Sequence, residues 1–109
     1  MASQSASQRK PATDAVKADP KHYKVEFENE KVRVLRVSYG PREKSEMHTH
    51  PPSVAIFLKD QHSRHTLPDG KSEEMRSKAG EVRFMDAWEH NPENLSDAPF
   101  ELIVVELKS

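Results

Sequence analysis

The fold class of this chain is indicated by the stretch VRVLRVSYGP, residues 32–41. Apolar side chains alternate along it, so one face of an extended strand carries Leu35, Val37 and Tyr39 and the other face carries the remaining valines. Gly40-Pro41 ends the pattern, because both residues interrupt a strand ladder. The stretch therefore predicts a long β-strand.

Similar patterns of strand length lie on both sides of this stretch, separated by turn residues such as Pro68-Asp69-Gly70. No window shows sustained helical periodicity. In one of these strands we expect Val82 and Phe84 to point inward. Short strands at this spacing predict an all-β sandwich or barrel. The other expected strands are Lys24–Glu28, Val54–Leu58, Ser63–Leu67, Lys71–Ser77, Glu81–Met85 and Phe100–Leu107.

The 109 residues correspond to one domain. Residues 1–22 contain only Met1 and Val16 as large apolar side chains and are rich in Ser, Gln, Lys and Ala. Such a segment buries too little surface to offset its conformational entropy, so we predict a disordered tail over 1–22 and a single domain over 23–109. A domain this small often gains stability by association, which predicts a homodimer.

Composition excludes several classes of function. Seventeen Lys and Arg against eighteen Asp and Glu give a formal charge of −1, which argues against a nucleic-acid partner. No apolar run approaches the length of a membrane-spanning helix, and the N-terminus has no apolar signal region. The absence of cysteine excludes disulfides, zinc–thiolate sites and cysteine nucleophiles. We expect a cytoplasmic protein with no nucleic-acid or membrane partner.

The histidines carry the chemistry. His48 and His50 are two residues apart, which on a strand places both imidazoles on one face. His90 follows forty residues later and could complete a three-histidine site for a divalent metal with open positions on the opposite side. Glu46 shares the strand parity of the pair, and Glu93 lies close to His90, so both are candidate fourth ligands. The pair alone is also compatible with surface histidines in a loop, and we interpret His22, His62 and His65 as ordinary polar residues.

The order of these residues resembles the two sequence motifs of the cupin superfamily. The first motif contains a glycine and His-x-His, and the second contains a glycine followed by His-x-x-x-Asn. The chain is similar to small single-domain bacterial cupins, including proteins named for beta-alanine degradation. The matching positions are Gly40, His48 and His50 in the first motif and Gly80, His90 and Asn94 in the second.

The chain also departs from these motifs. Val54 and Ala55 stand where the first motif has its glutamate. Asp86-Ala87-Trp88 replaces the Pro-x-Gly of the second motif, and the distance from Gly80 to His90 is one residue short. The site therefore lacks the usual carboxylate beside its histidines. A three-histidine site leaves more positive charge on the metal and one more position free.

The resemblance implies a cupin-type β-barrel, also called a double-stranded β-helix or jelly roll. It implies metal ligation by His48, His50 and His90, with Asn94 beside them in an outer shell. Iron is the metal expected of an oxygenase, while imidazole also accepts Zn, Ni, Mn or Cu. We expect a dioxygenase-like enzyme acting on a small polar metabolite. The alternative is a non-catalytic cupin that binds a metal or small ligand in a catabolic or regulatory pathway.

Strand parity predicts the walls of the pocket. Val54 to Leu58 is a continuous apolar run, and its alternate members should face the site. Arg36 or Arg83 could anchor a substrate carboxylate. The expected lining residues are Val54, Ile56, Leu58 and Trp88.

Overall fold

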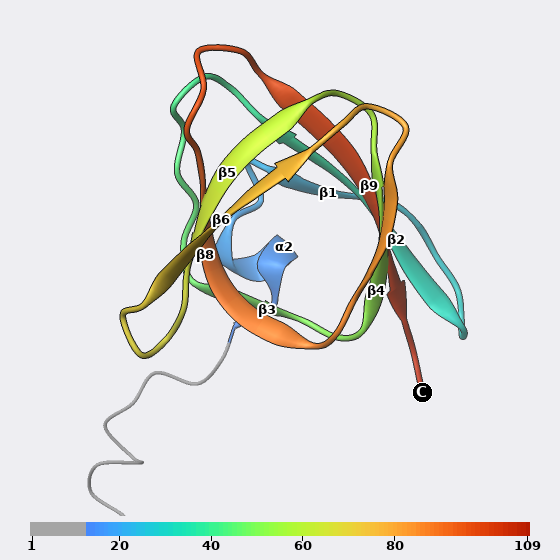
Figure 1. Cartoon of the computed structure of the whole chain (residues 1–109). Coiled ribbons are helices and arrows are strands. Elements are labelled where there is room, and N and C mark those ends of the chain that lie inside the picture. Colours follow the sequence, from blue (N-terminus) through green and yellow to red (C-terminus); the bar gives the residue numbers. More distant parts are fainter. Residues whose placement is uncertain (1–12) are drawn as a thin grey trace, which may run out of the picture.

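The computed structural model describes residues 13–109 and consists almost entirely of antiparallel strands (Figure 1). This confirms the predicted all-β class. One short helix precedes the first strand. The elements are α2 (Ala15–Ala18), β1 (Tyr23–Glu28), β2 (Val32–Tyr39), β3 (His48–His50), β4 (Ser53–Phe57), β5 (Gln61–Thr66), β6 (Ser72–Ser77), β7 (Val82–Met85), β8 (Trp88–Asn94) and β9 (Phe100–Leu107).

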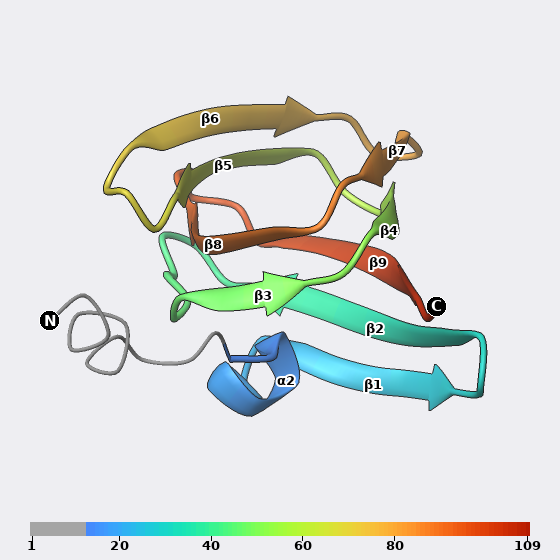
Figure 2. The same cartoon turned by 90° about the horizontal axis from the view of Figure 1, so that it is seen from below.

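The strands form two sheets that together enclose one interior (Figures 1 and 2). The five-stranded sheet has the order β1-β2-β9-β4-β7, and the four-stranded sheet has the order β3-β8-β5-β6. The last strand of the chain thus lies in the middle of the larger sheet, between β2 and β4. Among residues 13–109, no helix has the length and apolar character needed to cross a membrane.

The pairing of β2 with β9 supplies much of the core. The register runs from Val32 opposite Leu107 to Tyr39 opposite Phe100. Leu35, Val37 and Tyr39 are buried, as the alternation predicts, and β9 adds Phe100, Leu102 and Val104 from the neighbouring strand. β-Branched and aromatic side chains pack well on such a pleated surface, which stabilises both strands.

The predicted faces of β4 and β7 are wrong. The buried residues of β4 are Ser53, Ala55 and Phe57, so its other side chains point away from the interior. Val82 and Phe84 of β7 are each 60% exposed. Both faces of this sheet carry apolar side chains, and hydrophobicity therefore does not identify the inward face.

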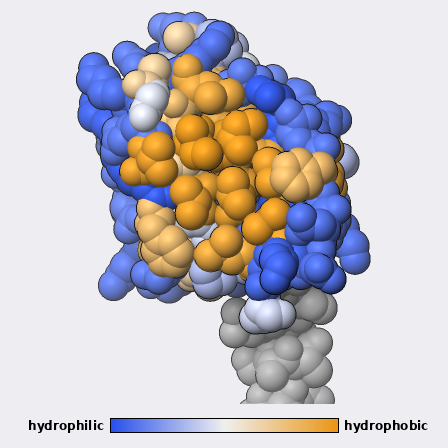
Figure 3. All heavy atoms as spheres, turned by 90° about the vertical axis from the view of Figure 1, so that its right-hand side faces the viewer, coloured by the Kyte–Doolittle hydropathy of each residue, from blue (hydrophilic) through white to orange (hydrophobic). Residues whose placement is uncertain are grey.

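The outward side chains form a broad apolar patch across the larger sheet (Figure 3). We call this patch the outer apolar face. It contains no charged side chain at its centre, where each of the five strands contributes one residue to a continuous row. Its residues are Phe27, Val32, Val34, Val54, Ile56, Val82, Phe84, Ile103, Val105 and Leu107.

The ordered part of the chain begins earlier than predicted. Residues 1–12 lie outside the described part, but residues 13–22 are folded and pack against β1 and β3 (Figure 2). Asp14 caps α2 by accepting hydrogen bonds from the backbone N–H groups of Val16 and Lys17, and Ala15 is fully buried. Composition missed this segment because its order depends on partners elsewhere in the fold.

Candidate metal centre

Three buried imidazoles converge inside the barrel at the junction of β3 and β8. His48 lies directly opposite His90 in the antiparallel register, and the alternation of β3 places His50 on the same face as His48. One nitrogen from each ring lies within 4.8 Å of the others. The structure thus brings together the three residues that the sequence suggested as metal ligands.

The second nitrogen of each ring is already engaged, which orients the rings. His48 Nδ1 lies 2.7 Å from the carbonyl oxygen of Glu46, and His50 Nδ1 lies 2.7 Å from Glu106 Oε2. Both partners only accept hydrogen bonds, so Nδ1 carries the proton and Nε2 presents a lone pair. The Nε2 atoms of His48 and His90 are buried with no hydrogen-bond partner among the described residues. Unsatisfied inward lone pairs on imidazoles fit a divalent metal ion.

Glu106 is a functional candidate that sequence reasoning missed. This β9 carboxylate is 3% exposed and contacts His50 through Oε2 while Oε1 accepts a hydrogen bond from Arg33 Nε at 2.8 Å. Arg33 in turn pairs with Asp14 at the start of α2. The site therefore does contain a carboxylate, but it bonds to a histidine and is not positioned as a fourth ligand beside the three rings. In the sequence it reads as an outward polar residue near the end of an apolar strand.

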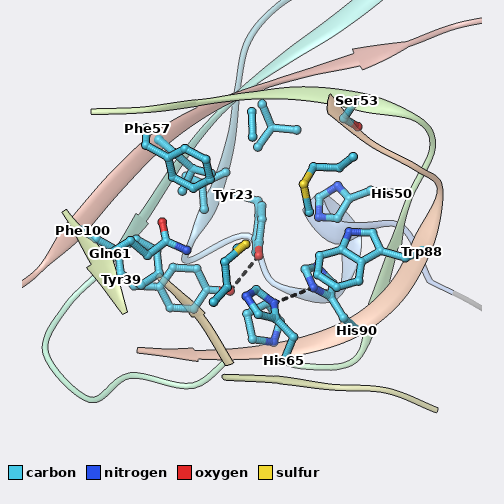
Figure 4. Close-up of a pocket in the computed structure, with 17 residues that line it drawn as sticks. Tyr23, Tyr39, His50, Ser53, Phe57, Gln61, His65, Trp88, His90 and Phe100 are labelled. Carbon is cyan, nitrogen blue, oxygen red and sulfur yellow. Dashed lines mark hydrogen bonds between the residues drawn. The ribbon is translucent and has the colours of Figure 1, made fainter. Parts of the chain in front are cut away.

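His65 is the second missed residue, since it is buried against His90 and is no ordinary surface histidine. The two Nδ1 atoms are 2.9 Å apart, and the rings stack with centroids 5.0 Å apart (Figure 4). When His90 Nε2 offers its lone pair to a metal, its Nδ1–H donates to His65 Nδ1. His65 Nε2–H then donates to Ser63 Oγ at 2.8 Å. The signal available in the sequence was the alternation of polar residues Gln61, Ser63 and His65 along one strand.

The structure does not place the other candidate ligands at the centre. Glu46 contributes only its backbone carbonyl, and its side chain is exposed. Glu93 points to the outer surface, where it pairs with Arg64 at 3.8 Å. Asn94 is fully buried but bonds to the carbonyl oxygens of Gly40 and Ala98, so it holds a loop in place.

A cavity of about 60 Å³ adjoins the histidines (Figure 4). Trp88 lines it as predicted, with its ring centroid 4.0 Å from that of His90. Val54, Ile56 and Leu58 do not line it, because the opposite face of β4 points inward. Its lining residues are Tyr23, Val37, Tyr39, His50, Ser53, Ala55, Phe57, Gln61, His65, Met75, Met85, Trp88, His90, Pro92, Phe100, Leu102 and Val104.

The expected arginine anchors are also absent from this lining. Arg36 lies on the outside of the sheet and pairs with Glu26 at 2.7 Å. Arg83 bonds to Glu81 and to the backbone carbonyl of Arg76. The cavity lining therefore contains no charged Asp, Glu, Lys or Arg side chain.

Burial keeps the imidazoles of His48, His65 and His90 neutral by lowering the pKa of each ring. Desolvation, reinforced by the neighbouring His50, lowers the pKa of His48 to about 4. Desolvation alone lowers the pKa of His65 to about 4, and the pKa of His90 is lowered by desolvation and by the other three histidines. Neutral imidazole is the form that binds metal ions, so the site is prepared for a metal at neutral pH.

These pKa values predict that the metal-free protein loses stability as the pH falls from about 6.5 to about 4. Below pH 6.5 His48 and His65 become protonated in the unfolded chain but stay neutral in the folded protein, whose pKa values for them are about 4. The free energy of unfolding is therefore full above pH 6.5, falls below that pH, and has lost this contribution once the pH has passed through about 4. Each of His48 and His65 should contribute on the order of 3 kcal/mol. Urea unfolding between pH 7.5 and 4 measures this.

The matched variants separate the buried imidazoles from other groups. His65→Leu should flatten the pH dependence much more than His62→Asn, because His62 lies outside the cavity in a partly exposed pair with Glu74. A free energy of unfolding that stays constant between pH 6.5 and 4.5 would contradict this electrostatic account.

Comparison with solved structures identifies proteins that share this arrangement of strands. A cupin domain from Bordetella pertussis Tohama I matches with a TM-score of 0.74 and 22% identity, over 93% of this chain and 100% of that one. The chain has the cupin fold. An uncharacterised double-stranded β-helix protein from Klebsiella pneumoniae matches with a TM-score of 0.62 and 16% identity, over 91% and 90% of the two chains. No protein-family model and no curated protein matches the sequence.

Cupins that hold a metal are among the similar structures. Bacillus subtilis oxalate decarboxylase, described with Mn(II) centres, matches with a TM-score of 0.56 and 20% identity, over 72% of this chain and 22% of that one. In the present cupin fold, the histidine cluster and its orphaned Nε2 atoms support a metal-binding role.

Proposed function

We propose that this cupin-fold protein binds one divalent metal ion through the Nε2 atoms of His48, His50 and His90 and acts as an oxygenase-type enzyme on a small molecule. The observation that carries the proposal is the hydrogen-bonding of the three rings. Each Nδ1 is held by a fixed partner, while the Nε2 atoms of His48 and His90 lack one inside the barrel. Three neutral ligands would leave further coordination positions open to substrate.

When bound, the metal would supply Lewis acidity and, if it is iron, redox chemistry with O₂. The protein's own contribution is positional and electrostatic. Glu106 fixes the His50 ring and places a negative charge one shell away, which would strengthen the bond from Nε2 of that ring to a metal ion. The apolar walls of the cavity exclude water from the reacting molecule.

One observation favours the alternative of a non-catalytic binding protein. The tyrosine hydroxyls that line the cavity, those of Tyr23 and Tyr39, bond to each other at 2.7 Å (Figure 4). Burial raises the pKa of Tyr23 well above its usual value and also raises that of Tyr39, so neither acts as a base at neutral pH. Proton transfer in the cavity would therefore depend on the metal site.

A role in beta-alanine breakdown finds no support in this cavity. The lining offers no charged Asp, Glu, Lys or Arg side chain to hold either the carboxylate or the ammonium group of such a substrate. Iron remains the metal expected of an oxygenase, and the Mn(II) centres of the Bacillus enzyme, which is similar in fold, support manganese as an alternative.

Metal analysis of protein purified without chelator tests the proposal. We expect about one metal ion per chain, and His48→Ala and His90→Ala should each lower metal affinity at least about 100-fold. His62→Ala is the matched control and should retain the metal. A parent protein that neither carries nor takes up metal would overturn the proposal.

Oxygen consumption then separates the two functions. Iron-loaded protein that consumes O₂ only in the presence of a small chelating substrate is an enzyme. Tightly held zinc, with no substrate-dependent O₂ uptake in the iron-loaded form, identifies a binding protein.

A further inference from the structure

We propose that the ligand of this cavity is a small molecule with an apolar body and no charge at its far end, which donates a hydrogen bond to Gln61. This inference rests on the proposed metal site, because the other end of the ligand would reach the metal. It names the substrate class and assigns Gln61 as the residue that selects it.

The side-chain oxygen of Gln61 is a hydrogen-bond acceptor to which no described residue donates. Its side chain is 7% exposed and lines the cavity, and its Nε2 donates to Ser63 Oγ at 3.2 Å. The Oε1 atom is buried and has no hydrogen-bond partner among the described residues. A buried unpaired amide oxygen is costly, so this position favours a partner that brings its own donor.

The position of Gln61 determines how a ligand would be oriented in the cavity. Figure 4 shows Gln61 beside Tyr39 and Phe100 at one end of the cavity, with His50 and His90 at the other. A ligand that spans the cavity would present a metal-binding group to the histidines and a hydroxyl or N–H group to Gln61. Between these ends it would contact mostly aromatic and aliphatic walls.

The size of the cavity and the absence of charged residues from its lining limit the class of ligand that it can hold. Its volume of about 60 Å³ is room for about four to six water molecules, and hence for an organic molecule of fewer than about ten non-hydrogen atoms. No Lys or Arg lines the walls to neutralise a carboxylate at the far end. Burying an unpaired carboxylate is far more costly than burying a hydroxyl that has an acceptor.

Three hydroxamic acids with the same chelating group provide the test. Propanohydroxamic acid, 3-hydroxypropanohydroxamic acid and malonic acid monohydroxamate differ only in the group at the far end, which is methyl, hydroxymethyl or carboxylate. Titration into cobalt-loaded protein, followed by calorimetry and by the visible spectrum of the metal, gives their affinities. We expect the hydroxyl compound to bind about tenfold more tightly than the methyl compound, and the carboxylate at least about 100-fold more weakly than the hydroxyl compound.

The variant Gln61→Leu should abolish the preference for hydroxyl over methyl while leaving cobalt affinity unchanged. Met75→Leu is the matched control, since Met75 also lines the cavity but carries no acceptor, and the preference should persist there. Equal binding of all three compounds by the parent, or a preference that survives in Gln61→Leu, overturns the inference. In that case the amide oxygen holds a buried water only. Failure to bind cobalt at all overturns the proposed function instead.

A separate observation concerns the outer apolar face, which we propose is covered by a second copy of this chain. Phe27 is 54% exposed, and Phe84 is 60% exposed at the opposite edge of the same sheet. The register joins them through Val34, Val105 and Val54 into one row across five strands (Figure 3). Apolar patches this continuous usually mark an interface.

Charge and composition favour a second copy as the occupant. Charged residues around the patch already pair with one another, as in Arg36 with Glu26 and Lys108 with Glu28, so the rim selects no oppositely charged partner. Residues 1–12 contain no Val, Leu, Ile, Phe, Tyr or Trp that could match an apolar surface. An apolar face with a neutralised rim is best buried against another surface of the same kind, and a second copy of the chain supplies one about a two-fold axis.

Light scattering after size exclusion tests this assembly. The parent should be a dimer at micromolar concentration, and Phe84→Glu should raise the dimer dissociation constant at least about 100-fold while its circular dichroism spectrum is unchanged. Lys71→Glu is the control, because Lys71 is exposed at the turn between β5 and β6, on the four-stranded sheet. A monomeric parent at 100-fold higher concentration, or equal dissociation by both variants, would reject the second copy as occupant.

Discussion

Replacing Glu106 with glutamine should lower the metal affinity of the protein about 10- to 100-fold and destabilise the metal-free fold by about 3 kcal/mol. The carboxylate bonds to His50 Nδ1 at 2.7 Å and to Arg33 Nε at 2.8 Å while being almost fully buried. The amide keeps the size of the side chain but loses the charge. His50 then becomes a weaker ligand, and Arg33 keeps only Asp14 as its counter-charge.

Glu101→Gln is the matched control for this change. Glu101 lies on the same strand, but its pair with Arg36 at 3.3 Å is on the surface. Surface pairs contribute at most about 1 kcal/mol, so stability and metal affinity should be nearly unchanged. Urea unfolding and competitive metal titration measure both quantities, and equal effects of the two substitutions would show that Glu106 has no special role.

Deleting residues 1–19 should destabilise the protein by several kcal/mol and weaken metal binding, whereas deleting residues 1–12 should change neither. The longer deletion removes α2, whose Asp14 pairs with Arg33. It also removes Asp19, which accepts hydrogen bonds from Ser45 Oγ and His22 Nδ1, both at 2.5 Å. Arg33 bonds to Glu106, which contacts His50, and Ser45 Oγ lies 3.4 Å from His48 Nδ1.

The link from this segment to the metal centre is direct. The backbone N–H of Thr49, between the two histidines of β3, donates to the carbonyl oxygen of Thr13 at 2.8 Å. Without that contact β3 pairs only with β8 on its other edge. Thermal melts of the two truncated proteins, with and without metal, test this. If both truncations behave like the full chain, the N-terminal segment is not part of the site.

The sequence predicted those features that depend on local pattern. Alternation correctly identified β2 and its inward residues, and the order and spacing of His48, His50 and His90 correctly indicated the histidine cluster. Alternation failed for β4 and β7, because Val54 and Phe84 belong to a sheet that is apolar on both faces. A pattern of period two gives the two faces of a strand but does not state which one is buried.

The missed residues share a different cause. Glu106 and His65 matter because of partners distant in sequence, namely His50 and His90. The alternation of polar residues along β5 indicated that His65 shares a face with Gln61 and Ser63, but no local pattern identified His90 or His50 as the partners of these two residues. The same holds for residues 13–22, whose polar composition suggests disorder until Arg33 and Ser45 are placed beside them.

The central position of β9 has a consequence for the order in which the protein folds. β2 and β4 are both synthesised well before β9, yet each forms its central pairing with that later strand. Until then the nascent chain exposes unpaired apolar strands, and the carboxylate that orients His50 is not yet present. Pairings between such distant segments close slowly. We therefore expect the five-stranded sheet to form only after β9 has been synthesised, with the folding yield depending on how long the facing edges of β2 and β4 remain uncovered.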